Sequence, residues 1–247
     1  MSAVFLILAA TAASIPTKGW TPDQVIADPD FRRIGSVCVC AGKVTVADEE
    51  ARKLYQYSRD GMRSGQIGGE AIDFGKPVSV ACAGGRLMIA DTVAKKVIVL
   101  NFDGSLQLLI DGKPDHPFDE PYTLALDQDG QLCVLDRTAN HVYKVSRDGV
   151  VLQAFGTAGA GPGQFERAEA MAIDDQGRIY VADEAHSRVV VFEPGGAWIR
   201  EIGGKGKGPG KISGAIRASP STSAATCSCS TRTKGTSRSS TRRADRR

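Results

Sequence analysis

The chain is poor in the residues and motifs that mark common enzyme sites. Aromatic residues make up 6% of its 247 positions, and it contains only three histidines. It has no Gly-x-Ser-x-Gly motif, no His-Glu-x-x-His motif and no Cys-x-x-Cys pair. These absences argue against a hydrolase nucleophile elbow, a helical zinc protease site and a zinc ribbon, since each needs its residues at that spacing.

Long hydrophobic stretches are also lacking. One apolar run covers residues 3–13, and eleven residues are too few to span a bilayer as a helix. Its length suits a signal-peptide core with a small-residue cleavage site at Ala10-Thr11-Ala12, although only the amino terminus supplies positive charge. We expect a signal peptide at 1–14, an N-terminal extension at 15–30 and export to the periplasm or beyond. The alternative is a strand of an earlier repeat in a cytoplasmic protein.

An excess of positive charge is absent from most of the chain. The net charge of +3 arises in residues 217–247, which hold eight basic groups and one acid. The remaining 23 basic and 27 acidic residues give the body a net charge of −4. A nucleic-acid-binding body would be basic, so we expect no nucleic-acid partner.

Four of the six cysteines, Cys38, Cys40, Cys82 and Cys133, lie in β-like apolar runs. A free cysteine in such a run behaves as a small buried hydrophobic residue. Cys38 and Cys40 are two residues apart on one run, so they would line the same face and not bond each other. We expect all four to be structural thiols.

One motif, an apolar run that ends in aspartate, occurs four times. The copies are residues 44–48, 87–91, 132–136 and 179–183, and their aspartates lie 43, 45 and 47 residues apart. Another β-like run and a glycine turn precede each copy, and a third run, a turn and a fourth run follow it. Four short antiparallel strands in about 45 residues match one blade of a β-propeller.

The connectors between these units repeat as well. Residues 156–165 and 203–212 align residue for residue at an offset of 47, with glycines and a Gly-Pro-Gly step in both. Neither segment ends in the Gly-Lys-Ser/Thr of a phosphate-binding loop, and neither leads into a helical pattern. We therefore interpret both as blade-to-blade connectors.

The order of aspartate, polar insert, arginine, β-branched run, Asp-Gly turn and glycine-rich connector resembles the NHL repeat family. The first and fourth copies match best, through Asp48 with Arg52 and Asp183 with Arg188. The weaker copies replace the arginine with Lys95 and Lys96 or with Asn140 and His141. The resemblance covers about residues 31–212 and implies an all-β, six-bladed propeller, of which about four blades are intact here. A WD-repeat propeller is the alternative fold, but no Trp-Asp dipeptide occurs.

Beyond residue 212 the repeat stops, and Ser, Thr, Arg and Ala take over. A disordered basic tail is one interpretation. A one-base frameshift is the other, because serines read from TCN codons then become apolar residues and threonines become Asp-like ones. The recovered pattern over 219–231 aligns without a gap with residues 171–183. We interpret 213–247 as an out-of-frame fifth blade, and we expect the chain as written, with two open blade faces, to be poorly soluble or degraded.

No constellation of catalytic residues stands out. Some NHL-like propellers are lyases that use histidine and a metal in the central channel, but His116, His141 and His186 occupy non-equivalent repeat positions. We expect no catalytic residue, no metal and no cofactor, and we leave the binding residues open. The aspartates, once per blade, are expected to accept backbone N–H bonds in the following turn. The structural repeat signature is Asp48, Asp91, Asp136, Asp183, Arg52, Arg188, Gly61, Gly104, Gly149, Gly156 and Gly203.

The leading functional hypothesis is a non-catalytic scaffold that presents loops on a propeller face to a protein or another extended ligand. The alternative implied by the resemblance is a propeller lyase or a gluconolactonase-like lactone hydrolase. An RNA-binding NHL domain is disfavoured by the acidic body and by the lack of interleaved aromatic and basic residues. The oligomeric state is left open.

Overall fold

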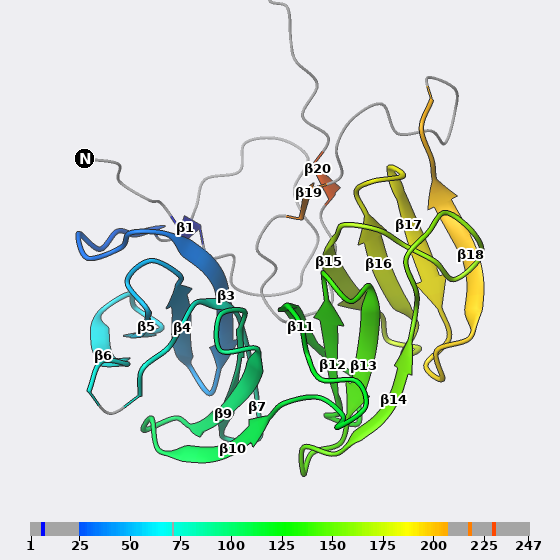
Figure 1. Cartoon of the computed structure of the whole chain (residues 1–247). Coiled ribbons are helices and arrows are strands. Elements are labelled where there is room, and N and C mark those ends of the chain that lie inside the picture. Colours follow the sequence, from blue (N-terminus) through cyan, green and yellow to red (C-terminus); the bar gives the residue numbers. More distant parts are fainter. Residues whose placement is uncertain (1–5, 8–24, 71, 207–216, 219–228, 231–247) are drawn as a thin grey trace, which may run out of the picture.

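The protein is built from four antiparallel sheets of four strands each, arranged side by side (Figure 1). This computed structural model describes residues 6–7, 25–70, 72–206, 217–218 and 229–230. Within each sheet the strands follow one another in chain order. The all-β propeller expected from the repeats is confirmed, and the four blades of the described residues do not close a ring.

Each blade uses one copy of the repeat. The first blade contains β3 (Ile34–Cys40), β4 (Lys43–Asp48), β5 (Lys53–Ser58) and β6 (Arg63–Ile67). The second contains β7 (Pro77–Ala83), β8 (Arg86–Asp91), β9 (Lys96–Asn101) and β10 (Leu106–Ile110). The third contains β11 (Pro121–Leu126), β12 (Leu132–Asp136), β13 (His141–Val145) and β14 (Val151–Phe155). The fourth contains β15 (Ala168–Ile173), β16 (Ile179–Asp183), β17 (Arg188–Phe192) and β18 (Trp198–Gly203).

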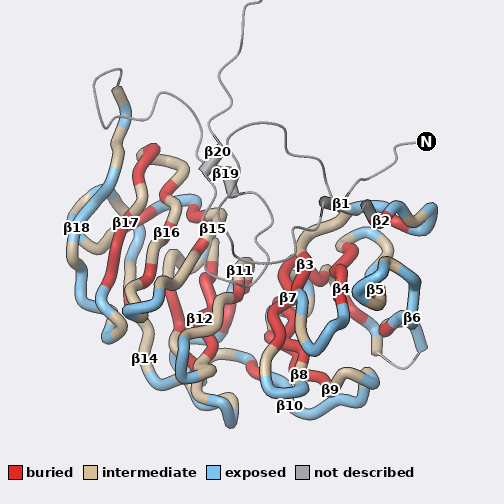
Figure 2. Tube along the Cα trace, turned by 180° about the vertical axis from the view of Figure 1, so that it is seen from behind, coloured by how far each residue is buried: buried red, intermediate tan, exposed pale blue. Residues whose placement is uncertain are grey.

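The core lies between the blades, because the second and third strands of each blade are apolar on both faces. Leu87, Ile89 and Leu100 of the second blade pack toward the first, and Val97 and Val99 pack toward the third. The fourth strands of the first two blades, β6 and β10, are mostly exposed, with burial confined to one end (Figure 2). Burial on two faces explains why these sequences read as continuous apolar runs and not as an alternation.

The turn between the third and fourth strands is the same in every blade. Gly61, Gly104, Gly149 and Gly196 each donate a backbone hydrogen bond to the residue three positions earlier, at 2.9 to 3.0 Å. All four have φ between 76° and 91°, a left-handed conformation that glycine adopts without steric cost. The Asp-Gly signal in the sequence therefore marks a conformational requirement of this hairpin.

Two of the four cysteines do not behave as expected. Cys40, at the end of β3, forms a disulfide with Cys82 of β7, across 42 residues and a Cα–Cα distance of 6.2 Å. The expectation of free thiols was wrong for this pair, because stacking of the first two blades brings together strands that are far apart in sequence. Cys38 and Cys133 are free and buried, and burial raises the pKa of each thiol to about 12.

Short strand pairs lie outside the blades. β1 (Leu6–Ile7) pairs with β2 (Val25–Ile26), and β19 (Arg217–Ala218) pairs with β20 (Cys229–Ser230). Ile26 and Phe31 pack with Tyr55 and Tyr57 on the face of the first blade that points away from the second. Most of the expected signal peptide at 1–14, and most of the segment interpreted as an out-of-frame blade at 213–247, lie outside the described residues. Within the described ranges, no helix has the length and apolar character needed to cross a bilayer.

Candidate functional site

The four repeat aspartates anchor the loops at one end of the blades. The side chains of Asp48, Asp91, Asp136 and Asp183 are completely buried. Asp91 shows the pattern: its carboxylate accepts backbone N–H bonds from Gly75 and Lys76 before β7, at 2.7 and 2.8 Å. It also accepts bonds from Val93 and Ala94 after β8, at 3.1 and 2.9 Å. Each aspartate thus joins the segment leading into its blade to the turn between the second and third strands.

The two signature arginines occupy different positions of the repeat. Arg188 pairs with Asp183 across the ladder from β16 to β17, so its equivalents are Lys53, Lys96 and His141. It is buried, and it donates hydrogen bonds to Asp183 at 2.9 Å and to the carbonyls of Ala160 and Gln164 at 2.7 and 2.8 Å. Arg188 therefore ties the glycine-rich connector 156–165 to the blade that follows it.

Arg52 lies one position earlier and has φ of 54°, the left-handed conformation that Lys95, Asn140 and Ser187 share at the same place. Its guanidinium donates to the backbone carbonyl of Phe74 and forms an exposed ion pair with Asp73 at 2.6 Å. Arg52 and Arg188 therefore perform different structural tasks.

Glycines of the connectors are required by close packing as well as by backbone conformation. Gly156 has φ of 90°, and a Cβ there would lie 2.4 Å from a ring carbon of Phe165. Phe165, the last residue of the connector motif, is completely buried between the third and fourth blades. Gly203 has φ of 97° at the corresponding place after the fourth blade, and the connector beyond residue 206 lies outside the described residues.

Two of the three histidines, His116 and His141, lie close together, whereas His186 lies on the fourth blade. His116 lies in the loop between β10 and β11, with its ring 6.3 Å from that of His141 at the start of β13. The Nδ1 atom of His186 lies 2.9 Å from the Asp183 carboxylate. Among the residues with described positions, no three His, Cys, Asp or Glu side chains group in a way that could hold a metal ion.

Charged side chains gather at the end of the blades where the aspartates lie. We call this set the polar rim; its members are Arg33, Glu49, Lys76, Glu120, Arg137, Arg167, Glu169 and Glu184. Glu49 forms ion pairs with Arg33 at 3.3 Å and with Lys76 of the next blade at 3.4 Å. Arg167 lies 3.0 Å from Glu184 Oε2, close enough for an ion pair but without hydrogen-bond alignment. The rim carries both signs in equal number.

Arg137 is the most firmly held cation of the rim. Its guanidinium donates two hydrogen bonds to the Glu120 carboxylate, one of them at 3.1 Å, and lies 4.3 Å from the ring centre of Tyr122. Burial by itself would raise the pKa of Glu120, but hydrogen bonds from Arg137 and Thr138 outweigh it and lower that pKa. The pair is therefore ionised and pre-oriented at neutral pH.

A polar cavity of about 460 Å³ opens at the rim between the third and fourth blades. Its walls are formed by Arg137, Thr138, Asn140, Glu166, Arg167 and Glu169. The Oδ1 atom of Asn140 is buried and has no hydrogen-bond partner in the described part of the chain. The cavity thus places cationic donors and anionic acceptors around one space.

Of these cavity residues, only Asn140 was named from the sequence, as a substitute for the repeat arginine. The residue directly after each repeat aspartate is Glu49, Thr92, Arg137 or Glu184, so this position varies while the aspartate repeats. Such variation beside a constant framework residue is the signal that could have marked the rim. What it could not show is that Arg137 and Glu169, on different blades, line the same cavity.

Four-stranded blades with buried aspartates at one end define the fold as a β-propeller. A family model described as a six-bladed β-propeller matches residues 172–211, which span the fourth blade from β15 onward. No curated protein is similar enough in sequence to match the chain.

Solved structures share the fold at low identity. Virginiamycin B lyase from Staphylococcus aureus superposes with a TM-score of 0.60 and 13% identity, over 77% of this chain and 60% of the lyase. A streptogramin B lyase gives 0.56 and 14%, over 68% and 54% of the two chains. A protein of unknown function from Bacteroides caccae gives 0.55 and 13%, over 72% and 69%. The chain therefore spans somewhat more than half the length of the two lyases, and the likeness establishes the fold alone.

Proposed function

We propose that the protein is a non-catalytic binding propeller that holds an extended, peptide-like ligand at the polar rim. The observation that carries the proposal is the cavity between the third and fourth blades, where guanidinium and carboxylate groups face the same space. Binding surfaces in repeat proteins are commonly formed by the loops at one edge of the repeats, positioned by a rigid framework. Here the buried aspartates supply that framework.

The chemistry of the cavity favours a ligand with closely spaced donors and acceptors. Arg137 and Arg167 offer planar N–H donors for carboxylate or peptide carbonyl oxygens, and Glu166 and Glu169 accept from ammonium or amide groups. A peptide backbone with its alternating N–H and C=O groups satisfies this combination.

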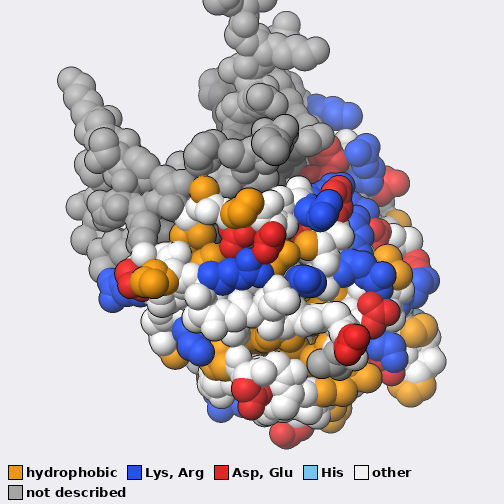
Figure 3. Space-filling view, turned by 90° about the vertical axis from the view of Figure 1, so that its left-hand side faces the viewer, with side chains coloured by type: hydrophobic (Ala, Val, Ile, Leu, Met, Phe, Trp, Pro, Cys, Tyr) orange, Lys and Arg blue, Asp and Glu red, His pale blue; other side chains and the backbone are white. Residues whose placement is uncertain are grey.

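Charge distribution supports a peptide over a nucleic acid. Binding to the phosphate backbone of a nucleic acid requires several Lys and Arg side chains that are not already paired with carboxylates. On the rim, Arg33, Lys76 and Arg137 are each paired with a carboxylate. Seen from the side of the first blade, Lys and Arg side chains are interspersed with Asp and Glu (Figure 3).

Binding of a labelled library of extended peptides, followed by titration of the selected peptides, tests this proposal. We expect Arg137→Gln and Glu169→Gln each to weaken binding by about tenfold or more, as for the loss of a charged hydrogen bond. Arg59→Gln, at the opposite end of the first blade, is the matched control and should leave affinity unchanged. Peptide affinities that are the same in all three variants would contradict the assignment of the rim.

The second candidate is a propeller lyase or lactone hydrolase, which is favoured by the likeness to solved lyases. Calorimetric titration with Mg²⁺ and Mn²⁺ separates the two functions, because a lyase of this kind would take up a divalent ion in the central channel. Stoichiometric ion binding would support the enzyme. Peptide binding that is unchanged by chelator would support the scaffold.

We also propose that the protein is exported to an oxidising compartment. The Cys40–Cys82 disulfide supports this, since structural disulfides persist in secreted and periplasmic proteins and are rare in the cytosol. Fractionation of expressing cells, with peptide mapping of each fraction, tests the proposal. An exported pool with the cross-link is expected, and a protein found only in the cytosol with both thiols free would refute it.

A further inference from the structure

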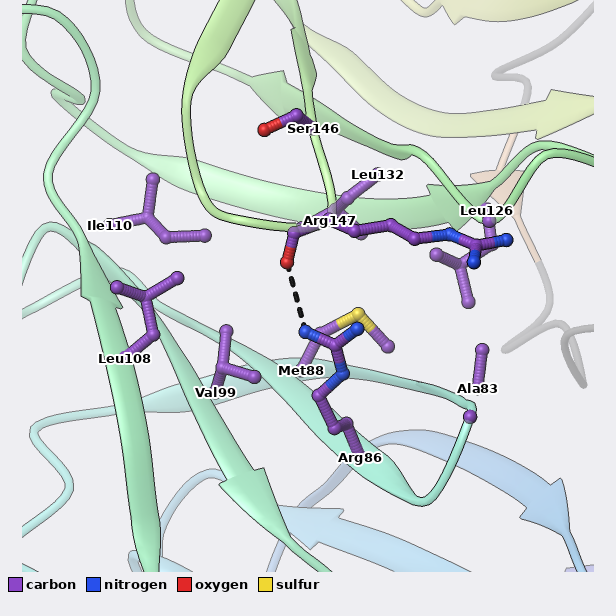
Figure 4. Close-up of a pocket in the computed structure, with 12 residues that line it drawn as sticks. Ala83, Arg86, Met88, Val99, Leu108, Ile110, Leu126, Leu132, Ser146 and Arg147 are labelled. Carbon is purple, nitrogen blue, oxygen red and sulfur yellow. Dashed lines mark hydrogen bonds between the residues drawn. The ribbon is translucent and has the colours of Figure 1, made fainter.

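A second cavity lies at the opposite end of the strands from the polar rim. It has a volume of about 130 Å³ and separates the second and third blades near their hairpin turns. Its lining comes from all four strands of the second blade and from β11, β12 and the turn after β13 in the third (Figure 4). None of its residues belongs to the polar rim, so it is a separate site.

The inner part of this cavity is apolar. Met88, Val99, Ile110 and Leu132 are all at least 91% buried, and they form its floor together with the partly buried Leu108 and Leu126. The volume is close to that of an engineered apolar protein cavity of about 150 Å³ that binds benzene. A phenyl ring or a branched aliphatic chain of similar size therefore fits between the blades.

The mouth of the cavity is cationic. Arg86 and Arg147 reach it from opposite blades, and Nη1 of Arg86 donates a 2.9 Å hydrogen bond to the backbone carbonyl of Arg147 (Figure 4). The Arg147 guanidinium donates two bonds to the carbonyl of Asp129, at 3.0 and 2.5 Å. These bonds use one N–H of Arg86 and two of Arg147, out of five on each guanidinium.

Both guanidinium groups are therefore held by backbone carbonyls, and the described residues place no carboxylate against either of them. An arginine fixed in this way keeps its remaining donors oriented, and within the described residues none of them is used in an ion pair. A carboxylate is the anion whose geometry matches that fork.

We propose that this cavity binds a small hydrophobic monocarboxylate, with its aromatic or branched apolar part between the second and third blades and its carboxylate at Arg86 and Arg147. The cavity volume selects the size of the apolar part, and the two guanidinium groups select the charge.

Phenylacetate is the probe of choice, titrated against the full-length protein by calorimetry and by protein-observed NMR. We expect a Kd on the order of 0.1 to 1 mM, as for a fragment of this size. Arg86→Gln and Arg147→Gln should each weaken binding about tenfold, the loss expected for one charge-assisted contact. Phenethylamine, which has the same ring and the opposite charge, should not bind.

The repeat supplies a matched control variant. Arg59 in the turn between β5 and β6 of the first blade is the repeat equivalent of Arg147 in the turn between β13 and β14 of the third blade. Unlike Arg147, it does not line the cavity. Arg59→Gln should leave phenylacetate binding unchanged. Ala83→Phe, at the cavity mouth, should block it while circular dichroism stays that of the parent protein.

Three results would overturn the proposal. They are no binding of phenylacetate at about 10 mM, tenfold above the weakest expected Kd, binding of phenethylamine as tight as that of phenylacetate, or a phenylacetate affinity in the Arg86→Gln and Arg147→Gln variants equal to that of the parent protein. Peptide binding at the rim is read separately, so its failure would leave this test unaffected.

Discussion

Loss of the Cys40–Cys82 disulfide should destabilise the protein strongly and in a way that depends on reductant. The bond closes a loop with a sequence separation of 42 residues that includes β4, β5 and β6 of the first blade and most of β7 of the second. In the chain-entropy account, a loop of that length restricts the unfolded state by about 4 kcal/mol. Since small domains are stable by only about 5–15 kcal/mol, this contribution is a large share of the total.

Urea unfolding with and without a phosphine reductant measures this contribution. With a slope of about 2 kcal/mol per molar urea, a loss of 4 kcal/mol lowers the midpoint by about 2 M. Cys82→Ala should show the low midpoint in both conditions. Cys133→Ala, which removes a buried free thiol from the third blade, should keep the full response to reductant.

Peptide mapping under non-reducing conditions shows whether the cross-link is present before unfolding. If Cys40 and Cys82 are found linked and yet the midpoint is the same with and without reductant, the reasoning from loop entropy fails. If both are found as free thiols in exported protein, the pairing itself is refuted.

Three further results are expected. Asp91→Ala leaves four backbone donors without their acceptor and should cost about 3 kcal/mol or more in urea unfolding, whereas Asp103→Ala, at an exposed aspartate, should change stability far less. Glu120→Gln should lower stability at neutral pH. Because the pKa of Glu120 is lowered from 4.5 in the folded protein, its contribution is present above that value and lost as the pH falls through the folded pKa; the difference from the variant should therefore shrink in acid. Resequencing the gene across codons 205–247 should reveal a gained or lost base near codon 217, and a confirmed frame would refute the frameshift interpretation.

Short-range sequence patterns determine much of the fold. Each blade needs two apolar runs that can be buried on both faces, a buried aspartate and a glycine in its last hairpin, and these requirements recur every 43 to 47 residues. They act over a few residues, as with Asp91, whose partners lie within 16 positions. Patterns of this range are visible in one sequence, and so the blades and their connectors were predicted from it.

The candidate sites were decided by the stacking of blades. Cys40 and Cys82 are neighbours only because β3 packs against β7, and Arg86 meets the backbone of Arg147 only because the second blade packs against the third. The same packing brings Arg137 and Glu169 to one cavity. The repeat determines the strands and turns of each blade. Contacts between blades depend on side chains that differ from one copy to the next, and only the assembled structure determines which of these side chains lie opposite one another.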